Sequence, residues 1–66
     1  MTRAQSAALK WLSDHGGDGM FDKNGVLLAA GESAPVRRVT WNNLRDLGKV
    51  EMYGGPRGRS RVRVKS

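Results

Sequence analysis

The chain has 66 residues and a mass of 7.2 kDa, which is the size of one small domain, so we expect residues 1–66 to form a single domain. A chain of this length buries only about 60% of the surface that it exposes when unfolded, which leaves little room for an enclosed substrate or cofactor pocket. There is no cysteine, which excludes disulfides, cysteine-ligated zinc and thiol catalysis. The longest apolar run, residues 26–30, is far shorter than the roughly 20 residues that span a bilayer, and the first residues show no secretion signal. We therefore expect a cytoplasmic domain with no membrane segment, no cofactor and no small-molecule substrate.

The positive charge is concentrated in the second half of the chain. Twelve Lys and Arg side chains outnumber six Asp and Glu, for a net charge of +6. Residues 1–33 carry three basic and four acidic side chains, whereas residues 34–66 carry nine basic and two acidic ones. Eight of the twelve basic residues are arginines, which bind phosphates and guanine edges through paired hydrogen bonds. This asymmetry favours a surface for a polyanion; a solvated basic segment without a partner is the alternative.

Residues 2–15 are predicted to form a helix. Thr2 is a suitable N-cap, the segment is rich in alanine and leucine, and Gly16 suits the left-handed position that ends a helix. The next segment, residues 18–21, is long enough only for a loop or a brief strand.

A second helix is expected over residues 22–31. Asp22 is a plausible N-cap, and the apolar spacing would bury three side chains on one face: Val26, Leu27 and Ala30. Gly25 weakens this helix by up to about 1 kcal/mol relative to alanine.

A third helix is predicted over residues 35–47, with Pro35 in its first turn and Gly48 as its stop. At 100° per residue, one face is apolar and comprises Val36, Val39, Thr40, Leu44 and Leu47. The opposite face is cationic and comprises Arg37, Arg38, Trp41, Asn42, Arg45 and Lys49. Asn43 falls near the apolar centre, where it would need a hydrogen-bond partner.

The last segment alternates between apolar and polar residues. This period of two predicts two antiparallel strands, residues 50–53 and 61–65. The seven-residue loop between them, residues 54–60, contains three glycines and two arginines. The predicted hairpin therefore ends in a flexible, charged tip.

The order of helix, short strand, two further helices and basic hairpin resembles the winged helix-turn-helix family over nearly the whole chain. The local pattern of residues 39–50 is similar to a recognition helix that leads through a glycine into the first wing strand. The resemblance implies an α+β fold with three helices and a C-terminal two-stranded β-hairpin wing. It also implies that the third helix enters the major groove of double-stranded DNA while the wing lies along the backbone or in the minor groove.

The hairpin loop carries a second, partial resemblance. Its Pro56-Arg57-Gly58-Arg59 string is similar to the core of the AT-hook, in which arginines beside a glycine enter the narrow minor groove of A·T-rich DNA. Ser60 stands where an AT-hook usually has a second proline. A loop whose arginines touch only phosphates is the alternative.

Together these observations predict a small DNA-binding regulator or architectural factor that is not an enzyme. Arginines and asparagine on a helix 10–12 Å wide match the edges of guanine and adenine in a major groove about 12 Å wide. Trp41 either packs into the core or contacts DNA. The expected DNA-binding residues are Arg37, Arg38, Trp41, Asn42, Arg45, Lys49, Arg57, Arg59, Arg61 and Arg63.

No catalytic or metal-binding group is predicted. The sequence Ser13-Asp14-His15 has the residue types of a catalytic triad, but neighbours on a helix point about 100° apart and cannot act as a relay. Two other functions stay open, a protein-interaction module and binding of RNA or a single strand. A homodimer also stays open, and if the chain is bacterial or from a phage we expect it at the nucleoid.

Overall fold

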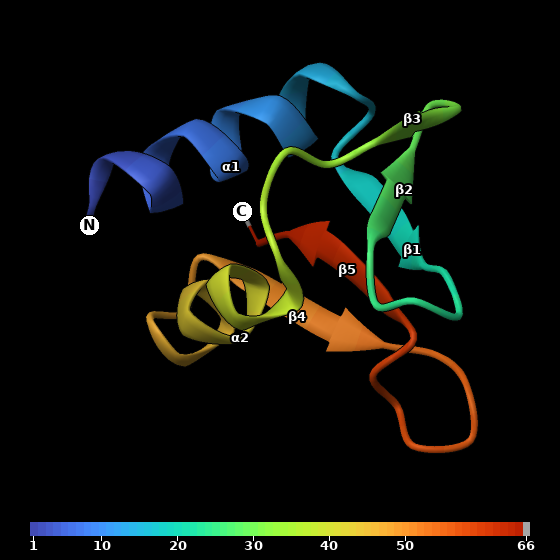
Figure 1. The fold of residues 1–66 in the computed structure, drawn as a ribbon. Coiled ribbons are helices and arrows are strands. Elements are labelled where there is room, and N and C mark those ends of the chain that lie inside the picture. Colours follow the sequence, from blue (N-terminus) through green and yellow to red (C-terminus); the bar gives the residue numbers. More distant parts are fainter. Residues whose placement is uncertain (66) are drawn as a thin grey trace.

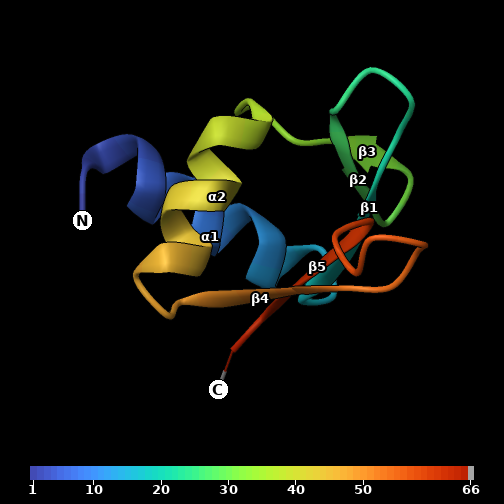
Figure 2. The ribbon, with the colours of Figure 1, turned by 90° about the horizontal axis from the view of Figure 1, so that it is seen from below.

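A computed structural model describes residues 1–65, which form two helices and one five-stranded antiparallel sheet (Figure 1). The elements in chain order are α1 (Arg3–Asp14), β1 (Asp18–Phe21), β2 (Leu27–Ala29), β3 (Glu32–Ser33), α2 (Arg38–Asp46), β4 (Val50–Tyr53) and β5 (Arg61–Val64). The strands lie in the order β3-β2-β1-β5-β4, so the two-residue strand β3 and the four-residue strand β4 form the edges of the sheet. The two helices pack against each other on one side of β4 and β5 (Figure 2).

The expected three-helix winged helix-turn-helix fold is wrong, because residues 22–31 form a turn and a β-hairpin instead of a helix. The Asp22 carboxylate accepts backbone hydrogen bonds from Asn24 and Val26, at 2.8 and 2.9 Å, and so closes a turn after β1. Gly25 adopts a φ of +79°, which a right-handed helix excludes. The residue predicted as an N-cap therefore starts a hairpin.

The predicted two-stranded wing is part of the larger sheet. β4 and β5 pair as expected, with Val50 opposite Val64, but β5 also pairs with β1, with Gly19 opposite Val62. β1 in turn pairs with β2, which carries the small edge strand β3. Of the loop and the brief strand that the sequence left open for residues 18–21, the strand is observed, and it is the central strand of the sheet.

The ends of both helices follow local sequence signals. α1 is closed by a capping box in which Thr2 accepts from the Gln5 backbone while the Gln5 side chain accepts from the Thr2 backbone, as predicted for an N-cap at Thr2. α2 begins at Arg38 rather than at residue 35, because Arg37 is still extended, with ψ of 166°. It ends before Gly48, whose φ is +74°, as expected for a helix stop.

The core lies between the helices and the inner face of the sheet. Trp41 and Leu44 of α2 are fully buried there, whereas Val39 and Leu47 are 59% and 52% exposed. The predicted apolar face of this helix is therefore right for Leu44 but wrong for Val39 and Leu47, because α2 is rotated so that the indole, the larger apolar group, enters the core. Asn43 consequently faces solvent and needs no buried partner.

Candidate nucleic-acid interface

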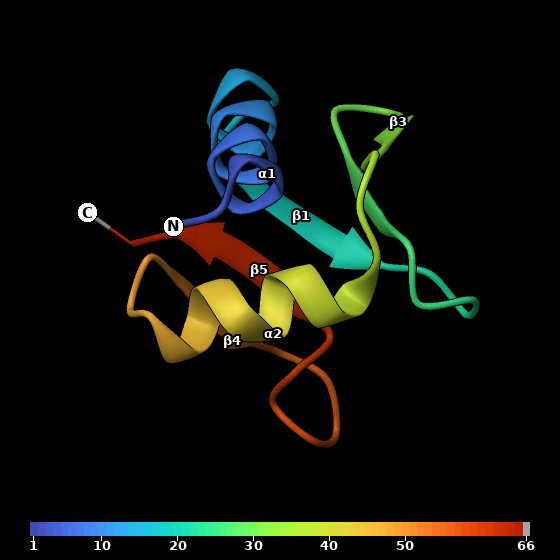
Figure 3. The same ribbon diagram turned by 60° about the vertical axis from the view of Figure 1, so that its left-hand side comes forward.

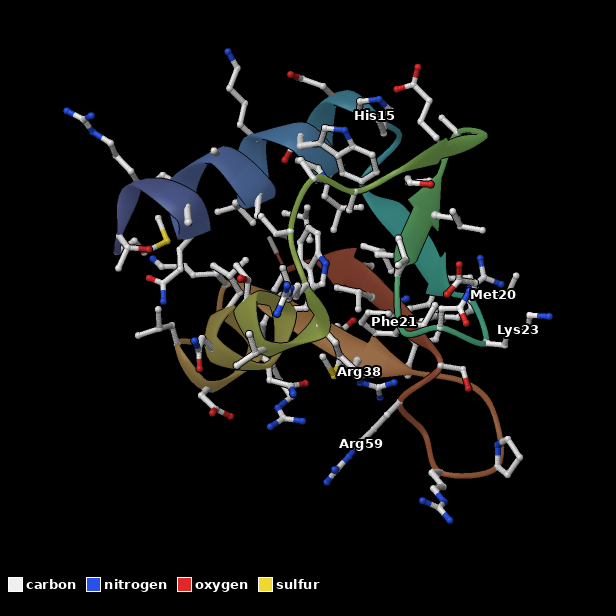
Figure 4. All side chains as sticks on the ribbon, in the orientation of Figure 1. His15, Met20, Phe21, Lys23, Arg38 and Arg59 are labelled. Atoms are coloured by element: carbon white, nitrogen blue, oxygen red, sulfur yellow. The ribbon has the colours of Figure 1, made fainter. Side chains whose placement is uncertain are left out.

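The N-terminal end of α2 meets the 54–60 loop through Arg38. This side chain donates an Nη2–H to the backbone oxygen of Arg59 over 3.1 Å, and its guanidinium lies 4.4 Å from the centroid of the Phe21 ring. Figure 4 shows Phe21 beside Arg38, with Arg59 on the loop side. Figure 3 shows the loop projecting from the end of β4 and β5 below the N-terminal half of α2. The helix end, the loop and β1 are thus joined at one cationic side chain.

Backbone hydrogen bonds give the loop a defined shape. Two bonds of 3.2 Å close it, one from Gly58 to Gly55 and one from Ser60 to Gly54. Gly55 adopts a φ of +74°, and a Cβ at this position would collide with the Ser60 side chain. The tip expected to be flexible is therefore folded back on itself.

Arg57 and Arg59 are the exposed cations of this loop. Within residues 1–65, neither guanidinium forms an ion pair with a carboxylate or a side-chain hydrogen bond. Each can donate up to five N–H groups to a ligand, and a guanidinium presents them in a planar fork that matches a phosphate.

Arg45 lies on the flank of α2 that faces β4. Arg45 is held there, because it donates two hydrogen bonds to the Asp46 carboxylate, at 3.2 and 3.1 Å, and one to the sulfur of Met52. Asn42 is half-buried on the same flank, whereas Arg37 and Lys49 are exposed at the two ends of the helix. The five polar residues that the sequence assigned to this helix therefore all reach the surface, with Arg37 and Lys49 just outside the helix: Arg37, Arg38, Asn42, Arg45 and Lys49.

Arg61 and Arg63 lie on the other face of the sheet. Their guanidinium carbons lie 5.6 and 4.7 Å from the centroid of the Tyr53 ring. Arg61 is directly opposite Tyr53 in the sheet, and Arg63 is two residues further along β5. Arg63 is also paired with Glu51, which raises the pKa of this guanidinium above its ordinary value. The sheet thus separates this pair from the face that carries α2.

Tyr53 lies on the same face of the sheet and is hydrogen-bonded there. Its hydroxyl donates a hydrogen bond to Asp18, and this bond, with partial desolvation, raises the pKa of Tyr53 above its ordinary value. Arg61 approaches the same carboxylate at 3.7 Å. Charges on this face are therefore largely compensated internally, in contrast to those of the loop.

The structure places Trp41 in the core, with no exposed surface. Of the two alternatives for this residue, burial is the one observed, and the indole offers no surface to DNA. Sequence reasoning missed Phe21, which supports Arg38, and also the exposed side of α2 with Val39 and Asn43. Nothing in the local sequence of residues 18–21 signals the contact with Arg38, since it depends on the pairing of β1 with β5.

Residues 1–65 contain neither a cluster of metal-binding side chains nor a membrane-spanning helix. No group of three or more His, Cys, Asp or Glu side chains in this part of the chain is placed to hold a metal ion. None of its helices has the length and apolar character needed to cross a membrane. Comparisons with protein-family models, curated proteins and solved structures give no match for the chain.

Proposed function

We propose that this domain binds double-stranded DNA through the exposed side of α2 and the 54–60 loop. The observation that carries the proposal is the contact between Arg38 and the Arg59 backbone, because it brings the cations of two separate elements to one surface. Those cations have few internal partners, and net charge of this size draws a polyanion by long-range attraction. We place the activity in the cytoplasm, at the nucleoid if the source is a bacterium or a phage, and expect a regulator or architectural factor.

The two elements have different tasks in this proposal. Arg57 and Arg59 hold phosphates or enter the adjoining minor groove, which positions the domain on the duplex. Asn43 on the exposed side of α2, and the half-buried Asn42 on the flank beside Arg45, can each bond the N6 and N7 atoms of adenine in the major groove. Val39, at 59% exposure, offers an apolar contact to a thymine methyl group.

Salt-dependent titration of a duplex tests the proposal. We expect the logarithm of the association constant to fall with the logarithm of salt concentration, with a slope of about −0.9 for each phosphate contacted. Arg57→Ala and Arg59→Ala should each weaken binding and reduce the slope by about one. Preferential loss on A·T-rich duplexes would assign the arginine to the minor groove, and equal loss on all sequences would assign it to phosphates.

Lys10→Ala is the matched control, because it removes one exposed positive charge from α1, on the side of the molecule away from the loop (Figure 1). It should leave the slope unchanged. A slope near zero, an equal effect of Lys10→Ala and Arg57→Ala, or tighter binding of a single strand or RNA than of the duplex would contradict the proposal.

The outer face of the sheet favours one other function, a protein-interaction module. Met20 and Leu28 pair across β1 and β2 and are 53% and 38% exposed, next to Arg61 in the same row. These neighbours fit a partner that presents an apolar side chain beside a carboxylate. Met20→Asp should abolish binding of such a partner without changing duplex affinity; loss of duplex affinity in this variant would instead place DNA on the outer face.

A further inference from the structure

A concave site lies where the 54–60 loop, β1 and α2 meet. Its volume is about 470 Å³, within the roughly 300–1,000 Å³ typical of small-ligand sites. It is lined by Phe21, Arg38, Pro56, Arg57, Arg59 and Ser60, together with Asp22. The site is open to solvent and adjoins the proposed duplex surface, with which it shares Arg57 and Arg59.

The charge of the cleft fits a dianion. Three arginines and one acidic residue, Asp22, are among the residues that line it. The Asp22 carboxylate is already engaged, because one of its oxygens accepts from the backbone N–H groups of Asn24 and Val26. The excess of two positive charges matches a phosphate monoester, which carries about −1.5 to −2 at neutral pH, better than an internal phosphodiester with a single charge.

The donors of the cleft are available to such a group. Arg38 uses one N–H for the Arg59 backbone and retains the others, and its stacking on Phe21 holds the guanidinium plane in place. The side chains of Arg57 and Arg59 have no acidic partner within residues 1–65. Phe21 and Pro56 add an apolar wall of the kind that a sugar or base can cover.

We propose that this cleft binds the phosphate monoester of a nucleotide, presented either by the 5′ end of a DNA strand or by a free nucleotide. The strand-end form rests on the proposed duplex binding, since the same loop contacts the duplex beside it. Arg38, Arg57 and Arg59 hold the phosphate, and Phe21 and Pro56 cover the attached sugar.

The first experiment compares three DNAs of one sequence: a dumbbell duplex without ends, a linear duplex with 5′-hydroxyl ends and a linear duplex with 5′-phosphate ends. We expect about tenfold tighter binding of the phosphorylated duplex than of the hydroxyl duplex, the gain from one added hydrogen bond to a charged group. Arg38→Gln should remove this preference. Lys49→Gln, which removes a cation outside the cleft, should weaken all three DNAs while preserving the preference.

The second experiment tests the free nucleotide. Thymidine 5′-monophosphate should shift the amide resonances of Phe21 and Ser60 in the wild-type protein but not in Arg38→Gln, and thymidine without phosphate should shift neither. The inference is overturned if the two linear duplexes bind equally and the nucleotide shifts no resonance of the cleft. Tight binding of the dumbbell in that case leaves the duplex proposal intact, whereas failure of all three DNAs to bind would refute the duplex proposal.

Discussion

Because α2 is rotated relative to the face expected from the sequence, substitutions at two of its residues should have opposite effects on stability. Trp41 is fully buried, and a buried tryptophan side chain removes on the order of 150–250 Å² from water. At about 25 cal/mol per Å², this burial contributes roughly 4–6 kcal/mol, and measured tryptophan-to-alanine changes in cores cost about 3–5 kcal/mol. A domain of this size has a total stability of roughly 3–10 kcal/mol, so Trp41→Ala should lose much or all of its folded population at 25 °C.

Val39→Ala should behave in the opposite way. Its side chain is 59% exposed, and alanine is the better helix former, so the stability should change by less than about 0.5 kcal/mol in either direction. Thermal unfolding followed by far-ultraviolet circular dichroism measures both variants. One kcal/mol corresponds to about 4–8 °C in a domain of 60–100 residues, so Trp41→Ala should lower Tm by more than about 12 °C if it folds at all.

Trp41→Phe keeps the comparison measurable if the alanine variant does not fold. The Nε1–H of Trp41 is buried without a hydrogen-bond partner among residues 1–65, and phenylalanine removes this unpaired donor while filling much of the space. The loss should therefore be clearly smaller than for Trp41→Ala but larger than for Val39→Ala. A greater loss of Tm in Val39→Ala than in Trp41→Phe would refute the rotation of the helix and restore the face expected from the sequence.

Two further predictions concern the sheet and the end of α1. His15 forms hydrogen bonds with the Trp11 carbonyl and the Glu32 carboxylate, and these bonds raise the pKa of His15 above 6.5. Their contribution to stability is therefore complete below pH 6.5 and is lost as the pH rises through the pKa of the folded state. Tm should fall over that pH interval in the wild type but not in His15→Gln, and an equal fall in both proteins would contradict the assignment. Gly19→Ala should lower the free energy of unfolding in urea by about 1–3 kcal/mol, because the added Cβ would lie 2.8 Å from the backbone oxygen of Leu28 in the neighbouring strand. Unchanged stability would show that β1 and β2 are not packed this closely.

The elements with strong local signals were predictable from the sequence. α1 lies between a capping threonine and a glycine with positive φ, and both signals act within one turn of the chain. The strands predicted over residues 50–53 and 61–65, and observed over residues 50–53 and 61–64, follow from the alternation of apolar and polar residues. These predictions depended on neighbouring residues alone.

The region after β1 shows why local signals can mislead. A short apolar run fits one face of a helix and a half-buried strand equally well, and aspartate favours both helix starts and turns. The pairing of β1 with β5 decides between helix and strand, and it joins residues that are more than forty positions apart in the sequence, such as Gly19 and Val62. Because β1 is held in the sheet in this way, residues 27–29 can pair with it as a further strand. Long-range pairing of this kind leaves no mark in the local pattern.

The candidate site was predictable in its charges but not in its grouping. The basic character of residues 57 and 59 and of α2 is plain in the sequence, whereas the division of the arginines between two faces depends on the rotation of α2 and the position of β5 in the sheet. The helical wheel assigned Trp41 to the polar face, because its angular position lies among the arginines. Side-chain volume, which decides what fills a core, is not part of such a wheel.

Chemical-shift mapping with the dumbbell duplex tests the proposed DNA interface most directly. We expect the largest amide changes in the first turns of α2 and in residues 54–60, with no change at Leu28 on the outer sheet face. Changes confined to the outer face or to α1, with the resonances of Arg38 and Arg59 unmoved at saturating duplex, would contradict this account.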